Sequence, residues 1–339
     1  MSTKGTTDAS RPSPTSHPAA LTDVAHSSTD VTTDTSSRRG SAPGRGRLAG
    51  IVAITITSIL WGTTGTAATF APAAGPLAIG AAALGIGGLL QAVIALPSLR
   101  KAWPNLRQRI GLVVLGAVAV AIYPLAFYSS MHLAGVAIGS VVSLASAPLA
   151  SGVLERVVEG QRLSRWWMVS AGLGIVGSVL LCVSKMDEPA TSPGVTVGVA
   201  LGLVAGATYA TYSWVAHRLM SEGISRAASM GAVFGGGGTL LMPVLALTGA
   251  PLVATSQAFL VASYMALVPM FIGYVLFGYG LTKVPASTAT TITLTEPAIA
   301  AILAVVIVGE RLNSVGWIGL AIIAAVLLIL AVAPATASE

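Results

Sequence analysis

The chain has 339 residues, of which 54% are hydrophobic and only 9% charged, and its formal net charge is +6. A soluble domain carries about 25% charged residues, so this composition and a mean hydropathy of +0.82 leave too little polar surface for a water-soluble protein. The basic residues fall in short groups between apolar runs, which argues against nucleic acid as a partner and predicts a polytopic protein of the lipid bilayer.

Residues 1–47 are rich in Ser, Thr, Pro and Gly and contain no apolar core of a signal peptide. Such a segment cannot bury enough apolar surface to offset the entropy of ordering, so we predict a disordered cytoplasmic tail. Its last basic group, RRGSAPGRGR, is expected to orient the first membrane helix rather than to bind anionic lipid.

Ten apolar segments follow the tail, each near the roughly 20 residues that a membrane-spanning helix needs. The basic segment RKAWPNLRQR is predicted to be a loop between the second and third helices. The expected fold class is all-α, with ten transmembrane helices. We place these helices near residues 50–70, 77–97, 110–130, 134–154, 166–184, 195–217, 227–248, 258–281, 286–308 and 314–334.

The basic residues of the loops predict the orientation of these helices. We count the Lys and Arg residues from Arg45 onward. With the N-terminus inside, ten helices place twelve of them on the cytoplasmic side. Only Lys185 and Arg311 fall outside. This bias follows the positive-inside rule, so we expect a multi-pass protein of the plasma or bacterial inner membrane with both termini in the cytoplasm.

The chain contains an internal repeat. A shift of 149 positions aligns APLASGVLERVVEGQRL, beginning at Ala147, with EPAIAAILAVVIVGERL, beginning at Glu296, without a gap. The helix-breaking prolines Pro148 and Pro297 coincide in this alignment. Each copy precedes one further apolar segment, which predicts two repeats of five helices.

The two predicted repeats occupy residues 48–184 and 195–334. Because five is odd, the second repeat enters the membrane from the opposite side, and the repeats form an inverted pair. Secondary transporters use this arrangement to place a binding site between repeats near the bilayer midplane. A duplication retained only for helix packing is the alternative interpretation.

Three segments resemble EamA-type members of the drug/metabolite transporter superfamily. They are LTEPAIAAILAVVIVGERLNSVGWIGLAIIAAVLLIL, its degenerate first-half counterpart SAPLASGVLERVVEGQRL, and ILWGTTGTA in the first helix. The resemblance covers roughly residues 50–334 and implies a transporter that moves small organic metabolites, often outward, through a central cavity. Ala147 stands opposite Glu296 in the first repeat, so an acidic function at the midplane would not be duplicated.

Glu296 is a carboxylate within an otherwise uncharged segment, about ten residues into its helix and therefore near the middle of the bilayer. An isolated charge there costs roughly 2.5 kcal/mol or more, so the side chain must face the interior, pair or stay protonated. One interpretation is a carboxyl that binds a substrate amine or a proton. The other is a neutral acid that donates a hydrogen bond, which Pro297 favours because it leaves the Thr293 carbonyl without its helical partner. The sequence leaves both open.

Other polar and aromatic side chains are candidates for the lining of a central cavity. Threonines flank the carboxylate, although threonine in membrane helices often bonds its own backbone. The first helix carries a tryptophan beside two threonines, and the third, sixth and eighth helices are rich in aromatic residues, of which those near helix ends are expected at the lipid–water interface. The predicted substrate-binding or coupling residues are Glu296, Thr293, Thr295, Trp61, Thr64, Tyr123, Tyr209 and Tyr274.

No catalytic residue, cofactor or metal site is predicted. GLGIVG, from Gly172 to Gly177, fits a dinucleotide pattern but lies in an apolar helix without a preceding strand. His132 and His217 lack Cys or acidic partners at ligand spacing, and no ATP-binding motif is apparent. We therefore expect a secondary transporter that exports amino acids or similar small metabolites, driven by a proton or substrate gradient. A membrane-embedded lipid-modifying enzyme and a passive channel are the alternatives, and the oligomeric state is not predicted.

Overall fold

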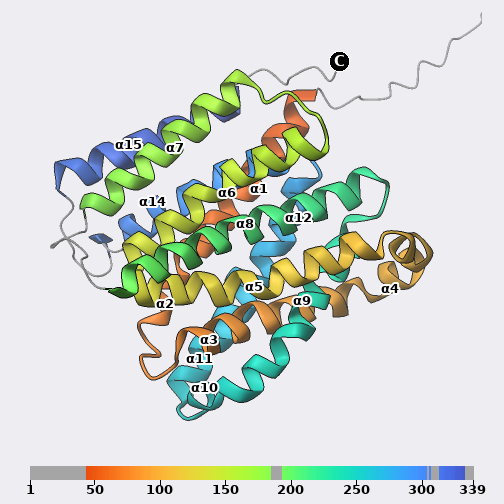
Figure 1. Ribbon diagram of the computed structural model, residues 1–339, viewed down its shortest axis with the longest axis horizontal. Coiled ribbons are helices and arrows are strands. Elements are labelled where there is room, and N and C mark those ends of the chain that lie inside the picture. The colour runs from red at the N-terminus through yellow and green to blue at the C-terminus, as the bar shows by residue number, and fades with distance from the viewer. Residues whose placement is uncertain (1–42, 185–192, 304, 307–312, 333–339) are drawn as a thin grey trace, which may run out of the picture. The chain divides into compact units, whose positions relative to one another are not determined.

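Helices make up nearly all of the part of the chain that the computed structural model describes, residues 43–184, 193–303, 305–306 and 313–332, and no strand occurs within it (Figure 1). A bilayer core holds no water to satisfy backbone N–H and C=O groups, so a spanning chain in it is confined to helices or closed barrels. Nine helical segments of the described residues are long and apolar enough to cross a membrane.

The first half of the chain contains one interrupted helix, one long composite helix and three regular helices. Its elements are α1 (Pro43–Gly62), α2 (Thr64–Ala68), α3 (Pro76–Gly80), the π-helical η1 (Ala81–Ile86), α4 (Gly87–Gln108), α5 (Ile110–Ala134), α6 (Val136–Val158) and α7 (Arg165–Ser184).

The second half also combines regular and interrupted helices, and its π-helical and 3₁₀-helical segments lie between Ala266 and Thr295. Its elements are α8 (Pro193–Ser221), α9 (Arg226–Thr248), α10 (Ala250–Val253), α11 (Ser256–Met265), the π-helical η2 (Ala266–Ile272), α12 (Gly273–Leu281), α13 (Ala286–Ile292), the 3₁₀-helical η3 (Thr293–Thr295), α14 (Glu296–Leu303) and α15 (Ser314–Val332).

The predicted helix 286–308 corresponds to α13, η3 and α14, which together we call helix nine. Several of its last predicted residues lie outside the described part of the chain. It is not among the nine candidate spans, so the total of ten stays a prediction.

Two predicted boundaries are wrong. The predicted loop RKAWPNLRQR is helical, because α4 continues to Gln108. The composite segment Pro76–Gln108 has 33 residues and would measure about 50 Å, well beyond a hydrocarbon core of about 30 Å, so its basic end reaches polar surroundings in which charges are tolerated. Helix α1 begins at Pro43, inside the predicted tail, since proline is favoured in a first helical turn that lacks hydrogen-bond acceptors for its N–H groups.

Helices from the two halves pack against each other in pairs. Helix α5 packs on α8, α1 on α12, α4 on α9, and α7 on α15, and the last pair lies side by side in Figure 1. In the order of the repeats, α1 corresponds to α8 and α5 to α12, so the α1–α12 pair is equivalent to the α8–α5 pair. The α4–α9 and α7–α15 pairs each join corresponding helices of the two repeats. This is the packing that a pseudo-two-fold relation between repeats produces.

The direction of the repeats follows from contacts between α6 and helix nine. Ser287 donates to Glu155, and Thr290, further along helix nine, donates to Ser151, which lies earlier in α6. The two helices therefore run antiparallel, as predicted from an odd number of helices in each repeat.

Glycines allow α4 and α9 to approach closely. A Cβ atom on Gly88 would collide with the carbonyl oxygen of Phe234, and one on Gly238 would lie 2.7 Å from the carbonyl oxygen of Gly85. Small residues permit such backbone contact between membrane helices. The GGGG run that ends at Gly238 is thus a packing surface.

Gly88→Leu should lower the thermal unfolding temperature in detergent and the amount of protein in the membrane. The added side chain would overpack the α4–α9 contact, at a cost of about 1–3 kcal/mol. Gly172→Leu is the matched control, because nothing lies within 4 Å of a Cβ atom added there. Equal unfolding temperatures for the two variants would contradict this account of the packing.

Candidate functional site

Four helices lose regular α geometry around one cavity. The π-helical η1 contributes Leu84, the π-helical η2 contributes Met270, and Glu296 follows directly on the 3₁₀ turn of η3. Thr64 opens α2, immediately after the break that ends α1. Irregular helical segments are frequent at functional sites, and transporters bind substrates where membrane helices are interrupted.

The cavity is closed and narrow. The space open to the centre of a water molecule is about 10 Å³, enough for about one water molecule. Its described lining consists of Trp61, Thr64, Ala83, Leu84, Tyr123, Pro124, Phe127, Tyr128, Met270, Tyr274 and Glu296.

Glu296 is 8% exposed and carries the only formal charge among these lining residues. None of the ion pairs found within the described part of the chain involves it. Its backbone N–H donates to the carbonyl of Thr293, because the 3₁₀ turn shortens the usual hydrogen-bond spacing. The carbonyl that Pro297 was expected to leave without a partner is therefore satisfied, which removes one reason to regard the carboxyl as a purely structural donor.

The two flanking threonines have different surroundings. The hydroxyl of Thr293 donates to the carbonyl of Thr290 and lies 2.8 Å from the hydroxyl of Tyr209. The hydroxyl of Thr295 donates to the carbonyl of Ile292 at 2.8 Å. Neither is among the lining residues. Of the eight predicted site residues, the structure thus brings Glu296 and four others to the cavity wall and places Thr293, Thr295 and Tyr209 behind it. Those four are Trp61, Thr64, Tyr123 and Tyr274.

Trp61 connects α1 to the widened part of the eighth membrane helix. Its indole N–H donates to the carbonyl of Pro269 at 3.0 Å, within the π-helical η2. Gln91 donates to the carbonyl of Phe271 at 2.9 Å, a buried polar contact that sequence patterns did not indicate. Two carbonyls of η2 thus accept from side chains of neighbouring helices, which ties this segment to α1 and α4.

Eight aromatic residues of the third, sixth and eighth predicted helices lie in the protein interior and not in an interfacial belt. Their rings pack on each other, with centroids 5.5 Å apart for Tyr123 and Tyr209 and 4.8 Å apart for Trp61 and Tyr274. Such spacings are favourable for aromatic pairs. The expectation of a lipid–water interface was wrong, because sequence position gives depth but not the side of the helix. The buried residues are Tyr123, Phe127, Tyr128, Tyr209, Tyr212, Trp214, Tyr274 and Phe277.

Glu155 is a second buried carboxylate, which the sequence analysis missed. The predicted helix ended one residue before it, whereas α6 continues to Val158. Glu155 is 4% exposed, and its oxygens accept from the backbone N–H of Ser287 at 2.8 Å and from the Ser287 hydroxyl at 2.5 Å. The carboxylate therefore caps the start of helix nine, where the first N–H groups have no acceptor within the helix.

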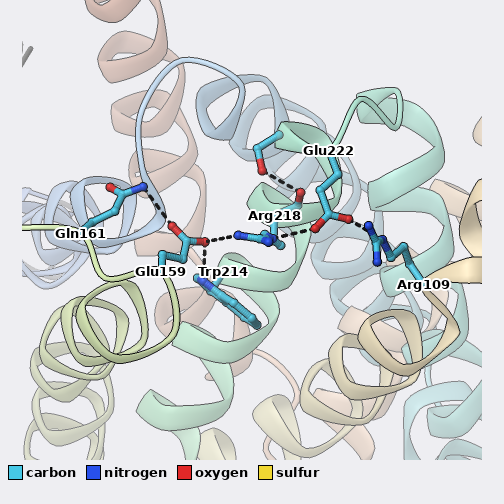
Figure 2. A network of polar contacts seen from close by, with 7 residues as sticks. Arg109, Glu159, Gln161, Trp214, Arg218 and Glu222 are labelled. Atoms are coloured by element: carbon cyan, nitrogen blue, oxygen red, sulfur yellow. Dashed lines mark hydrogen bonds and ion pairs between the residues drawn. The ribbon is translucent and has the colours of Figure 1, made fainter. Parts of the chain in front are cut away.

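A network of charged side chains lies at the same end of the bundle (Figure 2). Glu159 accepts from the indole N–H of Trp214 at 2.9 Å and lies 3.7 Å from Arg218. Glu222 bridges Arg218 at 2.8 Å and Arg109 at 2.7 Å. The network joins the ends of α6 and α8 to the start of α5, and so connects the two halves at the side that the positive-inside rule predicts to be cytoplasmic.

A larger cavity, wide open to the surroundings of the protein and lined in part by the exposed Phe70 and Leu260, occurs toward the opposite ends of the helices. It has a volume of about 470 Å³ and lies between the end of the first membrane helix and the start of α11. Thr63, Phe70, Gln257 and Tyr264 are among its lining residues. The hydroxyls of Thr63 and Tyr264 are 2.7 Å apart, and the next residue, Thr64, lines the narrow cavity with Glu296.

Comparison with known proteins agrees with this geometry. Residues 48–183 and 196–332 each match the EamA-like transporter family. The chain is 35% identical over 287 residues to Uncharacterized transporter YwfM of Bacillus subtilis (strain 168), a match that covers 83% of this chain and 93% of that protein. One crystal structure superposes with a TM-score of 0.67 at 20% identity, over 81% of this chain and 94% of the other, which shows likeness of fold.

Two helical repeats around a buried, largely aromatic cavity with a single carboxyl are typical of a multi-pass membrane transporter. The chain belongs to the EamA-like transporter family.

Glu155→Ala should destabilise the protein. It leaves the N–H and hydroxyl of Ser287 without their acceptor, and a buried unsatisfied group costs about 1–3 kcal/mol. Thermal unfolding in detergent measures the loss, and Glu155→Gln, which retains an acceptor oxygen, should lose less. An Ala variant that unfolds at the wild-type temperature would show that this cap adds nothing to stability.

Proposed function

We propose that this transporter exports an amino acid or a similar small metabolite by alternating access, and that Glu296 binds the substrate amine or a coupling proton. The observation that carries the proposal is the position of this carboxyl, which lines the cavity where four interrupted helices meet. A carboxyl buried in a membrane bundle without a paired cation is a functional site by default.

The contacts at the two ends of the bundle support alternating access. At the predicted cytoplasmic end, Glu155 and Glu159 connect α6 to Ser287 and Trp214 of the second half. Toward the other end lies the cavity of about 470 Å³. Its lining includes Thr63, the neighbour of Thr64, which lines the Glu296 cavity. The contacts of Glu155 and Glu159 support a state closed at the predicted cytoplasmic end, and opening that end would require them to separate. Export as the direction rests on the family resemblance.

The two alternatives have less support. A lipid-modifying enzyme needs catalytic groups that converge, yet within the described cavity lining Glu296 has no His, Cys, Ser or second acid beside it. The other buried carboxylate, Glu155, caps helix nine elsewhere. A passive channel needs a continuous pore, whereas the cavity has room for about one water molecule.

Glu296→Gln should abolish net or pH-dependent transport while folding and membrane abundance stay intact. Gln keeps the shape and the hydrogen-bonding capacity of the carboxyl, but it neither titrates nor attracts an amine. Uptake and counterflow in proteoliposomes, measured across a range of pH, test the prediction.

Glu155→Gln provides the matched control for this experiment. It neutralises the other carboxylate buried in the described bundle, which lies outside the cavity lining, and should retain the shape of the wild-type pH profile. A Glu296→Gln variant with the wild-type rate and pH profile would make Glu296 a structural hydrogen-bond donor and remove it from the site.

Arg218→Gln should favour opening of the predicted cytoplasmic end, because it removes both ion pairs of Arg218. The readout is the rate at which an impermeant maleimide, added from the cytoplasmic side, labels a cysteine introduced at Ser151 in a Cys182→Ser background. Partly exposed ion pairs contribute about 0.2–1 kcal/mol each, so the rate should rise severalfold at most. Arg156→Gln, which changes an exposed arginine at the same end, should leave the rate unchanged, and equal rates for both variants would exclude a closing role for Arg218.

A further inference from the structure

The chemistry of the cavity wall narrows the class of substrate, on the basis of the function proposed above. Five of the eleven described lining residues are aromatic, and one, Glu296, is acidic. None of the eleven is Lys, Arg or His. A single carboxylate among aromatic rings is suited to an organic cation, because the faces of Trp, Tyr and Phe attract positive charge.

The donors of the wall are largely engaged by the protein itself. The Trp61 indole N–H donates to the carbonyl of Pro269. The Thr64 hydroxyl donates to the carbonyl of Trp61 at 2.7 Å. The Tyr274 hydroxyl lies 2.7 Å from that of Tyr212. A substrate carboxylate would have to displace one of these three contacts or accept from the hydroxyls of Tyr123 and Tyr128, the other uncharged donors of the described wall.

The interruption of helix nine does not supply backbone N–H donors for a substrate carboxylate either. Transporters that bind a carboxylate can do so with free N–H groups at the start of a half-helix. Here the N–H of Glu296 is engaged by the carbonyl of Thr293, and Pro297 has no N–H at all. The start of α14 therefore presents a negative side chain where an anion site would need amide donors.

We propose that the Glu296 cavity takes an organic monocation without a carboxylate, such as an amine or quaternary ammonium with an apolar body, in preference to a zwitterionic amino acid. The cavity has room for about one water molecule, so it must widen to admit the cationic head, which then lies beside Glu296 with the aromatic wall around it. The body extends past Thr64 toward the cavity of about 470 Å³, which is lined in part by Phe70, Leu260 and Val261. A zwitterion would bring a second negative charge beside Glu296 into an apolar site, which is strongly unfavourable without a partner.

The test is counterflow in proteoliposomes of the full chain with two probes that differ in one group. Trimethyl(2-phenylethyl)ammonium is the cation, and N,N,N-trimethylphenylalanine is the same molecule with a carboxylate. Both carry a fixed positive charge, so neither leaks across the bilayer as a neutral amine. Unmodified phenylalanine and a panel of other amino acids are measured in parallel.

The cation should exchange at least about tenfold faster than its carboxylated partner, the order expected when one ligand brings an unpaired charge into an apolar site. Glu296→Gln should abolish this exchange. Glu155→Gln changes a contact that holds the predicted cytoplasmic end closed and so the absolute rate, but it should preserve the ratio between the two probes. Equal or faster exchange of the carboxylated probe or of any amino acid would overturn the inference and leave the proposed metabolite transport intact. Absence of exchange for every compound would contradict both.

Discussion

The first ten residues of helix nine are buried, and each of their polar groups must find a partner inside an apolar bundle. An unsatisfied backbone or side-chain group costs several kcal/mol where water is excluded. Glu155 satisfies the start of the helix through Ser287, and Thr293 contacts Tyr209 of α8. These contacts fix helix nine against both repeats, and this placement brings Glu296 to the cavity wall.

The irregular segments follow from the same requirement. Prolines and π-helical turns disturb the regular hydrogen bonding of a helix, and Trp61 and Gln91 donate additional hydrogen bonds to carbonyls of η2 from neighbouring helices. In helix nine, Pro297 has no N–H to donate to the carbonyl of Thr293. The 3₁₀ turn lets the backbone N–H of Glu296 donate to this carbonyl instead. Each interruption widens or tightens a helix locally and so shapes the cavity. A change in these few hydrogen bonds would change the cavity without unfolding a whole helix, which suits the alternating access proposed for this transporter.

The repeats agree in helix order but differ in polar chemistry. The contacts at the predicted cytoplasmic end depend on Glu155 and Glu159 of the first repeat. The positions 149 residues later are Ala304 and Val308, so the second repeat carries no acid at either equivalent position. Conversely, Glu296 belongs to the second repeat, and the equivalent position of the first repeat is Ala147, which is not acidic. In the proposed mechanism, the carboxyl that binds substrate and the carboxylates that close the predicted cytoplasmic end thus belong to different repeats.

The sequence by itself determined the class of fold and the repeat and singled out Glu296 as a candidate, because hydropathy, charge bias and an isolated intramembrane acid are properties of a linear pattern. It did not locate Glu155 in the interior, since a helix end predicted one residue too early put this acid in a loop. Nor did it place the aromatic residues, because residues at one depth face lipid or protein according to helix rotation. Only tertiary packing sets that rotation, and with it the enclosure of Glu296 by aromatic rings and without a basic neighbour in the described lining.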